Sequence, residues 1–205
     1  PVKEVELTQI SSPNNSVTCG QVNPKLLVTN NGQNTLTSFT VNYTVDGGTN
    51  QTFDWTGSLA SNTNTTIELP TIAATTEGVH TLQTEVILAD DFNTFNNSAT
   101  TSFTTNKSGV GQEVNNFDDV NVDKWIVSSN NLWQIGTPTT TRLNNKVASG
   151  YVTNPSGNYP DQTTSYLTSP CYDLSRLENP VLKFKMVFDL EENWDVVYLE
   201  YSTDQ

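Results

Sequence analysis

Residues 38–55 read SFTVNYTVDGGTNQTFDW, and this stretch decides the fold. Apolar residues alternate strictly with polar ones through its first half, which is the period of a strand with one buried face: Phe39, Val41, Tyr43 and Val45. The Asp-Gly-Gly sequence at 46–48 supplies residues that accept a positive φ, and Phe53 and Trp55 then resume the alternation. The stretch therefore predicts a β-hairpin.

Five more short runs rich in β-branched residues surround this hairpin, at 2–10, 26–29, 67–69, 81–88 and 99–104. Turn-forming residues separate them, most plainly at 30–32 and 61–64. About seven strands in about 105 residues are typical of an immunoglobulin-like sandwich. We therefore predict one such domain over residues 1–105.

A second domain is predicted after an aperiodic linker at 106–112, which contains two glycines. Residues 182–188 alternate, and residues 196–201 are apolar on both faces, so the two runs are predicted to be neighbouring strands. The sequence stops at 202–205, where a hairpin turn would begin, and we expect residues 113–205 to be a truncated jelly roll. The predicted fold class is all-β, with two tandem β-sandwiches.

Composition narrows the possible partners. The 205 residues include 22 acidic and 9 basic ones, for a net charge of −13, so no positive field attracts nucleic acid or anionic lipid. No apolar stretch approaches the roughly 18 residues of a membrane span, which predicts no membrane insertion. Abundant Thr and Asn with few charges favour a secreted or cell-surface β-protein.

The motifs of common enzymes are missing from the sequence. A zinc protease needs two His one helical turn apart, whereas His80 is the chain's single histidine; it lies at a strand start and is predicted to be half-buried and bonded to a carbonyl. No Gly-x-Ser-x-Gly motif is present. The segment is predicted not to be an enzyme, although a glycosidase-like pair of carboxylates stays open as an alternative.

The two cysteines, Cys19 and Cys171, fall in different predicted domains. A bridge between them would need a tight contact between the domains. We therefore expect two separate buried thiols, with a disulfide as the alternative.

Acidic residues gather at two places in the second half, around 118–123 and 191–195. Hard oxygen ligands from two loops suit Ca²⁺, so Asp118, Asp119 and Asp195 are candidate calcium ligands, with plain solvated acids as the alternative. Asp90 and Asp91 are expected to be solvated at a hairpin tip.

Exposed aromatic rings would serve sugar binding, because a flat ring stacks on a pyranose. Trp194, between acidic residues in a predicted loop, and Tyr151 are the candidate ligand-binding residues. Trp125 and Trp133 have apolar neighbours and are expected in the core.

Longer motifs resemble known modules. The first half, with VTNNGQNTLTSFTVNYTVDGG, FDWTGSLA and GVHTL, resembles the CARDB-like immunoglobulin-type modules of secreted Bacteroidetes multidomain proteins. The second half, with LWQIGTP, SYLTSPCYDLS, NPVLKFKM and WDVVYLEYSTD, resembles MAM-like jelly rolls of the same proteins, in which a calcium ion near the start of the domain implies Asp118 and Asp195 as ligands.

Such modules often follow a zinc metalloprotease domain or sit in adhesins, ahead of a C-terminal sorting domain for secretion. The resemblance therefore implies a non-catalytic accessory binding or adhesion segment, whose partners would be a glycan or a surface protein besides the rest of its own chain. The alternatives are the non-catalytic C-terminal part of a metalloprotease and a structural stalk without a ligand.

Overall fold

The computed structural model describes residues 1–73, 76–110, 115–118, 125–144, 146 and 148–202. The chain divides into two compact units, Pro1–Asn106 and Lys107–Asp204. Strands are the main regular structure of both units, although those of the second unit are short, and the one helical element described is a short 3-10 turn, η1 (Thr94–Asn96). The predicted all-β class is confirmed.

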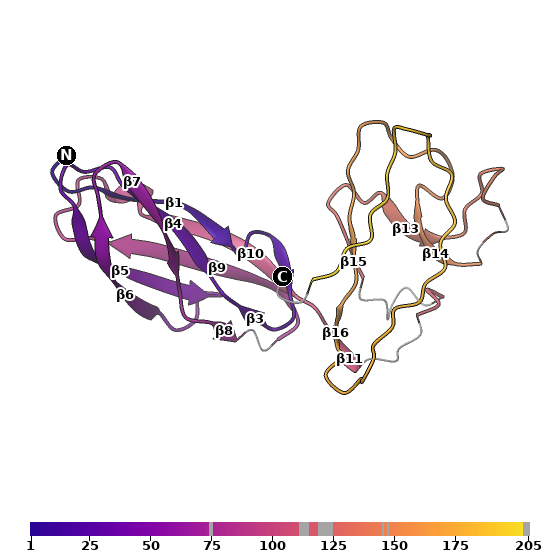
Figure 1. Ribbon diagram of the computed structural model, residues 1–205, viewed down its shortest axis with the longest axis horizontal. Coiled ribbons are helices and arrows are strands. Elements are labelled where there is room, and N and C mark those ends of the chain that lie inside the picture. Colours follow the sequence, from indigo (N-terminus) through magenta and orange to yellow (C-terminus); the bar gives the residue numbers. More distant parts are fainter. Residues whose placement is uncertain (74–75, 111–114, 119–124, 145, 147, 203–205) are drawn as a thin grey trace. The chain divides into compact units, whose positions relative to one another are not determined.

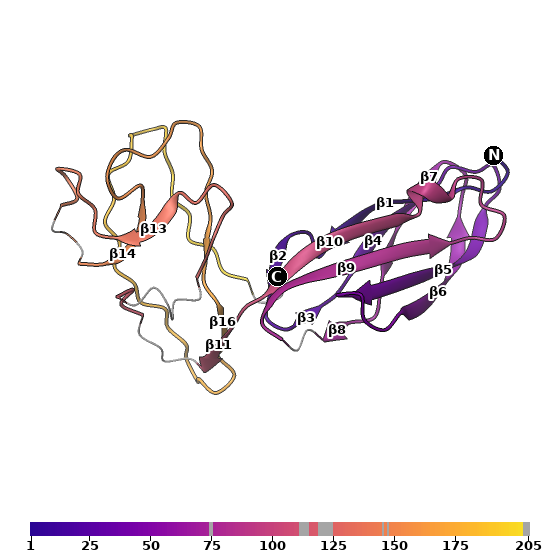
Figure 2. The same cartoon turned by 180° about the vertical axis from the view of Figure 1, so that it is seen from behind.

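The first unit is a sandwich of two sheets (Figures 1 and 2). One sheet has three antiparallel strands, in the order β1 (Val5–Ser12), β4 (Lys25–Asn30) and β7 (Thr63–Glu68). The other has five strands, in the order β2 (Ser16–Thr18), β10 (Ser98–Thr105), β9 (Gly78–Ile87), β5 (Leu36–Val45) and β6 (Gln51–Leu59). A small pair, β3 (Gln21–Val22) with β8 (Ile72–Ala73), completes the unit.

The core of the first unit lies between the two sheets. Phe39, Val41 and Tyr43 of β5 are all buried, which confirms the inward face predicted for this strand. The ring of Trp55 packs against the edge of this core and stacks on Phe39, with 4.5 Å between the ring centroids. The opposite sheet and the neighbouring strand β9 supply the rest of this interior, which includes Val5, Leu26, Val28, Ile67, Leu82 and Val86.

The predicted hairpin turn joins β5 to β6. Asp46 and Gly47 both have positive φ, at 52° and 65°, and the N–H of Gly48 donates to the carbonyl of Val45 at 2.9 Å. Two successive positive φ values match the twist of the strands they connect, and Asp and Gly tolerate them best.

His80 of β9 has a structural position, as predicted, and it is more deeply buried than expected, at 7% exposed. Its Nε2 bonds the carbonyl of Thr76 at 3.0 Å, and its Nδ1 bonds the carboxylate of Asp46 at 2.7 Å. The hydrogen bond to Asp46 raises the pKa of His80 and in turn lowers the pKa of Asp46.

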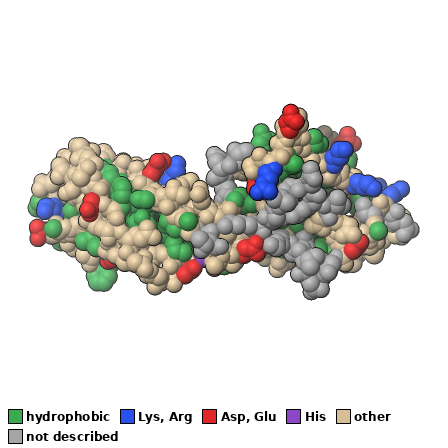
Figure 3. Space-filling view, turned by 90° about the horizontal axis from the view of Figure 1, so that it is seen from below, with side chains coloured by type: hydrophobic (Ala, Val, Ile, Leu, Met, Phe, Trp, Pro, Cys, Tyr) green, Lys and Arg blue, Asp and Glu red, His purple; other side chains and the backbone are tan. Residues whose placement is uncertain are grey.

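The described residues of the second unit form three short two-stranded pairings. β11 (Lys107–Val110) runs parallel to β16 (Cys171–Asp173), and β12 (Ile126–Val127) is antiparallel to β15 (Leu167–Thr168). β13 (Trp133–Gly136) is antiparallel to β14 (Gly150–Thr153). The predicted linker at 106–112 overlaps β11. On the face shown in Figure 3, acidic side chains are scattered singly over the described surface.

The strands predicted at 182–188 and 196–201 are wrong. The described residues from 174 to 202 include no strand, and most of their large apolar side chains are exposed, for example Leu182, Phe184 and Leu199. Alternation specifies the two faces of a strand, but a strand also needs a neighbour whose backbone groups complete its hydrogen bonds. Neither segment has such a pairing in the described part of the chain.

The expectation of two buried thiols is also wrong. Cys19 and Cys171 are both disulfide-bonded, and neither cysteine is free. Cys19 lies exposed in the turn after β2, and Cys171 begins β16 half-buried, so neither sulfur has the apolar enclosure of a core thiol.

Candidate ligand-binding site

The loop at residues 191–195 is held by its own hydrogen bonds. The N–H groups of Trp194 and Asp195 donate to the carbonyl of Glu191, at 3.2 and 3.1 Å. The N–H of Glu191 donates to Oδ2 of Asp195 at 3.0 Å, which closes the loop from the other side. Asn193 takes a positive φ of 69°, a conformation that Asn adopts more readily than most residues.

Tyr159 ties this loop to the remainder of the second unit. Its hydroxyl donates to Oδ2 of Asp195 at 2.5 Å, the same oxygen that receives the Glu191 N–H. This hydrogen bond to Asp195 raises the pKa of Tyr159, so the phenol keeps its proton and remains a donor at neutral pH. Asp195 is therefore the residue that orders the loop.

Trp194 projects from this ordered loop into solvent and is 80% exposed. Its indole offers a flat apolar face, and two exposed acidic residues, Glu191 and Glu192, precede it in the loop. A flat ring beside hydrogen-bond acceptors is the arrangement with which proteins hold a sugar, because the ring covers the C–H face while the acceptors bind hydroxyl groups. The structure thus leaves Trp194 available, as the sequence predicted.

Tyr151, the other predicted ligand-binding residue, packs inside an aromatic cluster. Its ring meets Phe117 edge-on at 5.5 Å and lies 6.2 Å from Trp125, and it is half-buried in β14. Trp125 also meets Phe117 edge-on, at 5.7 Å. Rings packed in this way bury part of their surface against one another. Tyr151 therefore has less accessible ring surface for a ligand than Trp194 has.

The predicted calcium ligands are only partly described. Asp119 lies outside the described residues. Asp118 accepts from Nδ2 of Asn116 at 2.7 Å, whereas Asp195 is engaged by Tyr159. No three His, Cys, Asp or Glu side chains group closely enough to hold a metal within the described residues. Calcium at these aspartates stays a prediction.

Asp91 was expected to be solvated at a hairpin tip, and this is wrong. Its carboxylate accepts the backbone N–H of Val5 at 3.2 Å and Nδ2 of Asn97 at 2.6 Å, whereas its neighbour Asp90 is exposed and lies 3.5 Å from Nζ of Lys3. Sequence reasoning missed this polar cluster because it depends on a contact between Val5 and Asp91, which are 86 positions apart and follow no local period.

The chain was compared with family models, with curated proteins and with solved structures. No family model matches the chain, and no curated protein matches it. Two solved structures of the CARDB domain of one Pyrococcus furiosus protein are similar, each with a TM-score of 0.39 and 22% identity: a crystal structure in complex with di-metal ions, and a solution NMR structure. They cover 50% and 51% of this chain, and 91% and 94% of their own. Both belong to the domain type that the first half of the sequence resembles.

Proposed function

We propose that this chain is a non-catalytic accessory segment of a secreted or cell-surface protein, and that it binds a glycan through the loop at 191–195. The observation that carries this proposal is the exposure of Trp194 on a loop that Asp195 and Tyr159 hold in place. A loop whose backbone is already held in place loses little conformational entropy when a ligand arrives.

The cost of leaving an indole in water supports a role for Trp194. Burying apolar surface is favourable by about 25 cal/mol per Å². A partner that covers the exposed ring of Trp194 would therefore be bound more tightly. A sugar also needs polar groups that orient its hydroxyl groups. These would be the carboxylates of Glu191 and Glu192, which accept hydrogen bonds, and the side-chain amide of Asn193, which both donates and accepts.

An extracellular location is supported by the oxidised cysteines, because disulfides persist mainly in oxidising compartments. No helix in the described residues is long and apolar enough to cross a membrane.

A second candidate partner is a polypeptide. The segments at 182–188 and 196–201 carry exposed apolar side chains, and exposed apolar surface often marks a protein contact. Under this alternative, the accessory role stays but the partner is a surface protein.

A glycan array probed with the full chain tests the proposal. Trp194→Ala is expected to lower binding at least tenfold, which corresponds to about 1.4 kcal/mol, while Trp194→Phe retains part of it because a smaller flat ring remains. Phe95→Ala is the matched control, since Phe95 is 98% exposed but lies in the first unit. Equal binding by wild-type protein and Trp194→Ala would refute the loop's role, and binding to no glycan would favour the polypeptide partner or a stalk.

A further inference from the structure

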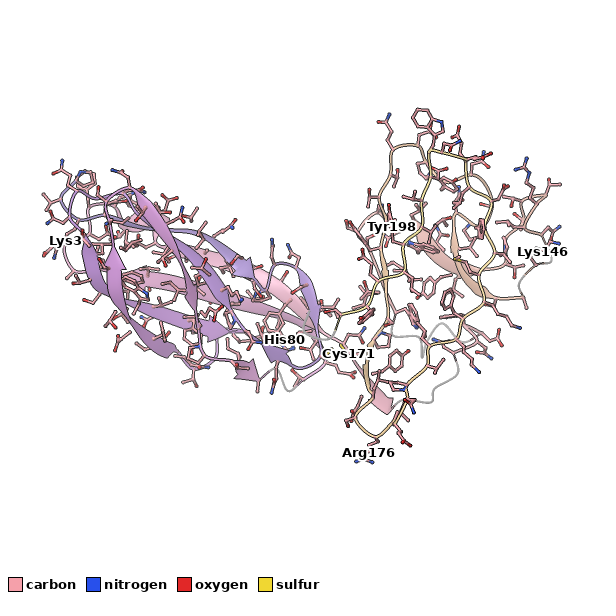
Figure 4. All side chains as sticks on the ribbon, in the orientation of Figure 1. Lys3, His80, Lys146, Cys171, Arg176 and Tyr198 are labelled. Atoms are coloured by element: carbon pink, nitrogen blue, oxygen red, sulfur yellow. The ribbon has the colours of Figure 1, made fainter. Side chains whose placement is uncertain are left out.

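The segment between β9 and β10 folds back over the start of β1, at the end of the first unit where Figure 4 labels Lys3. The N–H of Phe92 donates to the carbonyl of Lys3 at 3.2 Å, and the N–H of Val5 donates to Oδ1 of Asp91 at 3.2 Å. These two bonds bring the loop acid Asp91 beside Glu4, which lies just before β1.

Two asparagine amides connect these carboxylates to the start of β10. Nδ2 of Asn96 donates to Oε1 of Glu4 at 3.0 Å, and Nδ2 of Asn97 donates to Oδ2 of Asp91 at 2.6 Å. Each amide must present its nitrogen to the carboxylate, because the reverse orientation would set oxygen against oxygen. The orientation of both amide oxygens is fixed as a result.

Three oxygens of this network are buried and receive no hydrogen bond within the described structure: Oε2 of Glu4, Oδ1 of Asn96 and Oδ1 of Asn97. Glu4 is 4% exposed and Asn97 is 3% exposed. Buried polar atoms in proteins are nearly always satisfied, and an unsatisfied buried carboxylate oxygen is especially costly. The unsatisfied atoms are all acceptors, so the missing partner is a donor or a cation.

Lys3 does not supply that positive charge to Glu4. Its Nζ lies 3.4 Å from the carbonyl of Ala89 and 3.5 Å from Oδ2 of Asp90, and both of these hydrogen bonds are exposed to solvent. Glu4 and Asp91 together carry two negative charges in a network whose other members are neutral amides.

We propose that this cluster is a calcium site, in which Oε2 of Glu4 and the amide oxygens of Asn96 and Asn97 bind the ion and Asp91 completes the charge balance. Ca²⁺ takes carboxylate and amide oxygens in flexible geometry, whereas Mg²⁺ keeps several waters and a thiophilic metal would select sulfur or imidazole. The site has two acids and two amides, so it is distinct from the predicted site at Asp118, Asp119 and Asp195. Bound calcium would fasten the β9–β10 segment onto β1.

Isothermal titration of the full chain with CaCl₂, after treatment with a chelator, tests this site. Glu4→Gln is expected to weaken calcium binding by on the order of tenfold or more, because it removes a ligand oxygen and a charge. Glu6→Gln is the matched control: it removes the same charge from β1, but Glu6 is only half-buried and its Oε2 already accepts from Asn31 at 2.7 Å. The control should bind calcium like the wild-type protein.

Two further readouts separate a calcium site from a structural role of Glu4. Calcium should shift the side-chain amide resonances of Asn96 and Asn97 and should raise the melting temperature of the wild-type first unit, but not that of Glu4→Gln. Without calcium, Glu4→Gln should melt no lower than the wild type, because it removes an uncompensated buried charge. Unmoved amide resonances would overturn the proposal and indicate a buried water, and loss of all calcium binding in Asp195→Asn would place the ion in the second unit instead.

Discussion

Tyr43 illustrates how far a single residue follows from its neighbours in sequence. It lies on the predicted inner face of β5 and is 3% exposed, between Val41 and the partly buried Val45 on the same face. Burial raises the pKa of its phenol, since desolvation penalises the charged form. The ring is therefore part of the packed interior of the first unit.

Replacement of Tyr43 by Ala is expected to lower the free energy of unfolding by about 3–5 kcal/mol, because it removes a large buried ring and leaves a cavity. Tyr43→Phe keeps the ring and should lose less than about 1.5 kcal/mol. Urea denaturation followed by circular dichroism measures both changes. Equal stability of the Ala and Phe variants would mean that the ring does not fill the core.

Other residues could not be assigned from sequence, for a physical reason. The alternation around Tyr43 and the turn at 46–48 are local patterns, and the exposed Trp194 was predicted from its acidic neighbours. Glu4 and Asn97 are polar residues whose burial depends on a fold-back between distant parts of the chain. No period or motif in the sequence marks such a contact before the fold is known.

At the scale of elements, one residue, Asp46, connects the β5–β6 turn to the neighbouring strand β9. Asp46 in the turn accepts from His80 and from the backbone N–H of Thr81, at 2.7 and 2.8 Å. Both ring nitrogens of His80 face oxygen acceptors, so both bonds form fully only when the ring is doubly protonated. The ring also stacks on Phe103 of β10, with centroids 5.1 Å apart.

This contact predicts a pH dependence with a definite sign. The pKa of His80 is raised in the folded state above its ordinary value of 6.5, so its contribution to stability is complete below that value and is lost as pH rises through the folded pKa. The lowered pKa of Asp46 works oppositely: its contribution is present above the ordinary value of 3.8 and is lost as pH falls through the folded pKa. The pair stabilises the turn between these two limits.

Urea denaturation of the first unit's core at successive pH values from about 6 to 9 would test the prediction, since the ordinary pKa of His lies in the lower part of this range. The wild-type protein should lose stability as pH rises, whereas His80→Gln should be less stable at pH 6 and should lose this part of the slope. Because His80 is the chain's single histidine, no other imidazole contributes. An identical slope in both proteins would contradict the prediction.

The second unit shows where the same pattern reasoning fails. Alternation at 182–188 predicts a strand with two faces, but all seven residues are exposed, because a strand depends on a partner that local sequence does not identify. In the first unit, the close turn at 46–48 brings β5 to β6, and the register of this pair follows. The long connections of the second unit give no such guide, so its strand pairings could not be predicted.

For the whole molecule, oxidation of the cysteines is the feature that composition could not reveal. A disulfide stabilises a fold mainly because it restricts the unfolded chain, and removing one typically costs about 2–4 kcal/mol. Reduction of Cys19 and Cys171 is therefore expected to lower the midpoint of urea denaturation. The double variant Cys19→Ser/Cys171→Ser should resemble the reduced wild type and should not respond to reductant. If reductant leaves the wild-type midpoint unchanged, oxidation of the cysteines does not contribute to the stability of the fold.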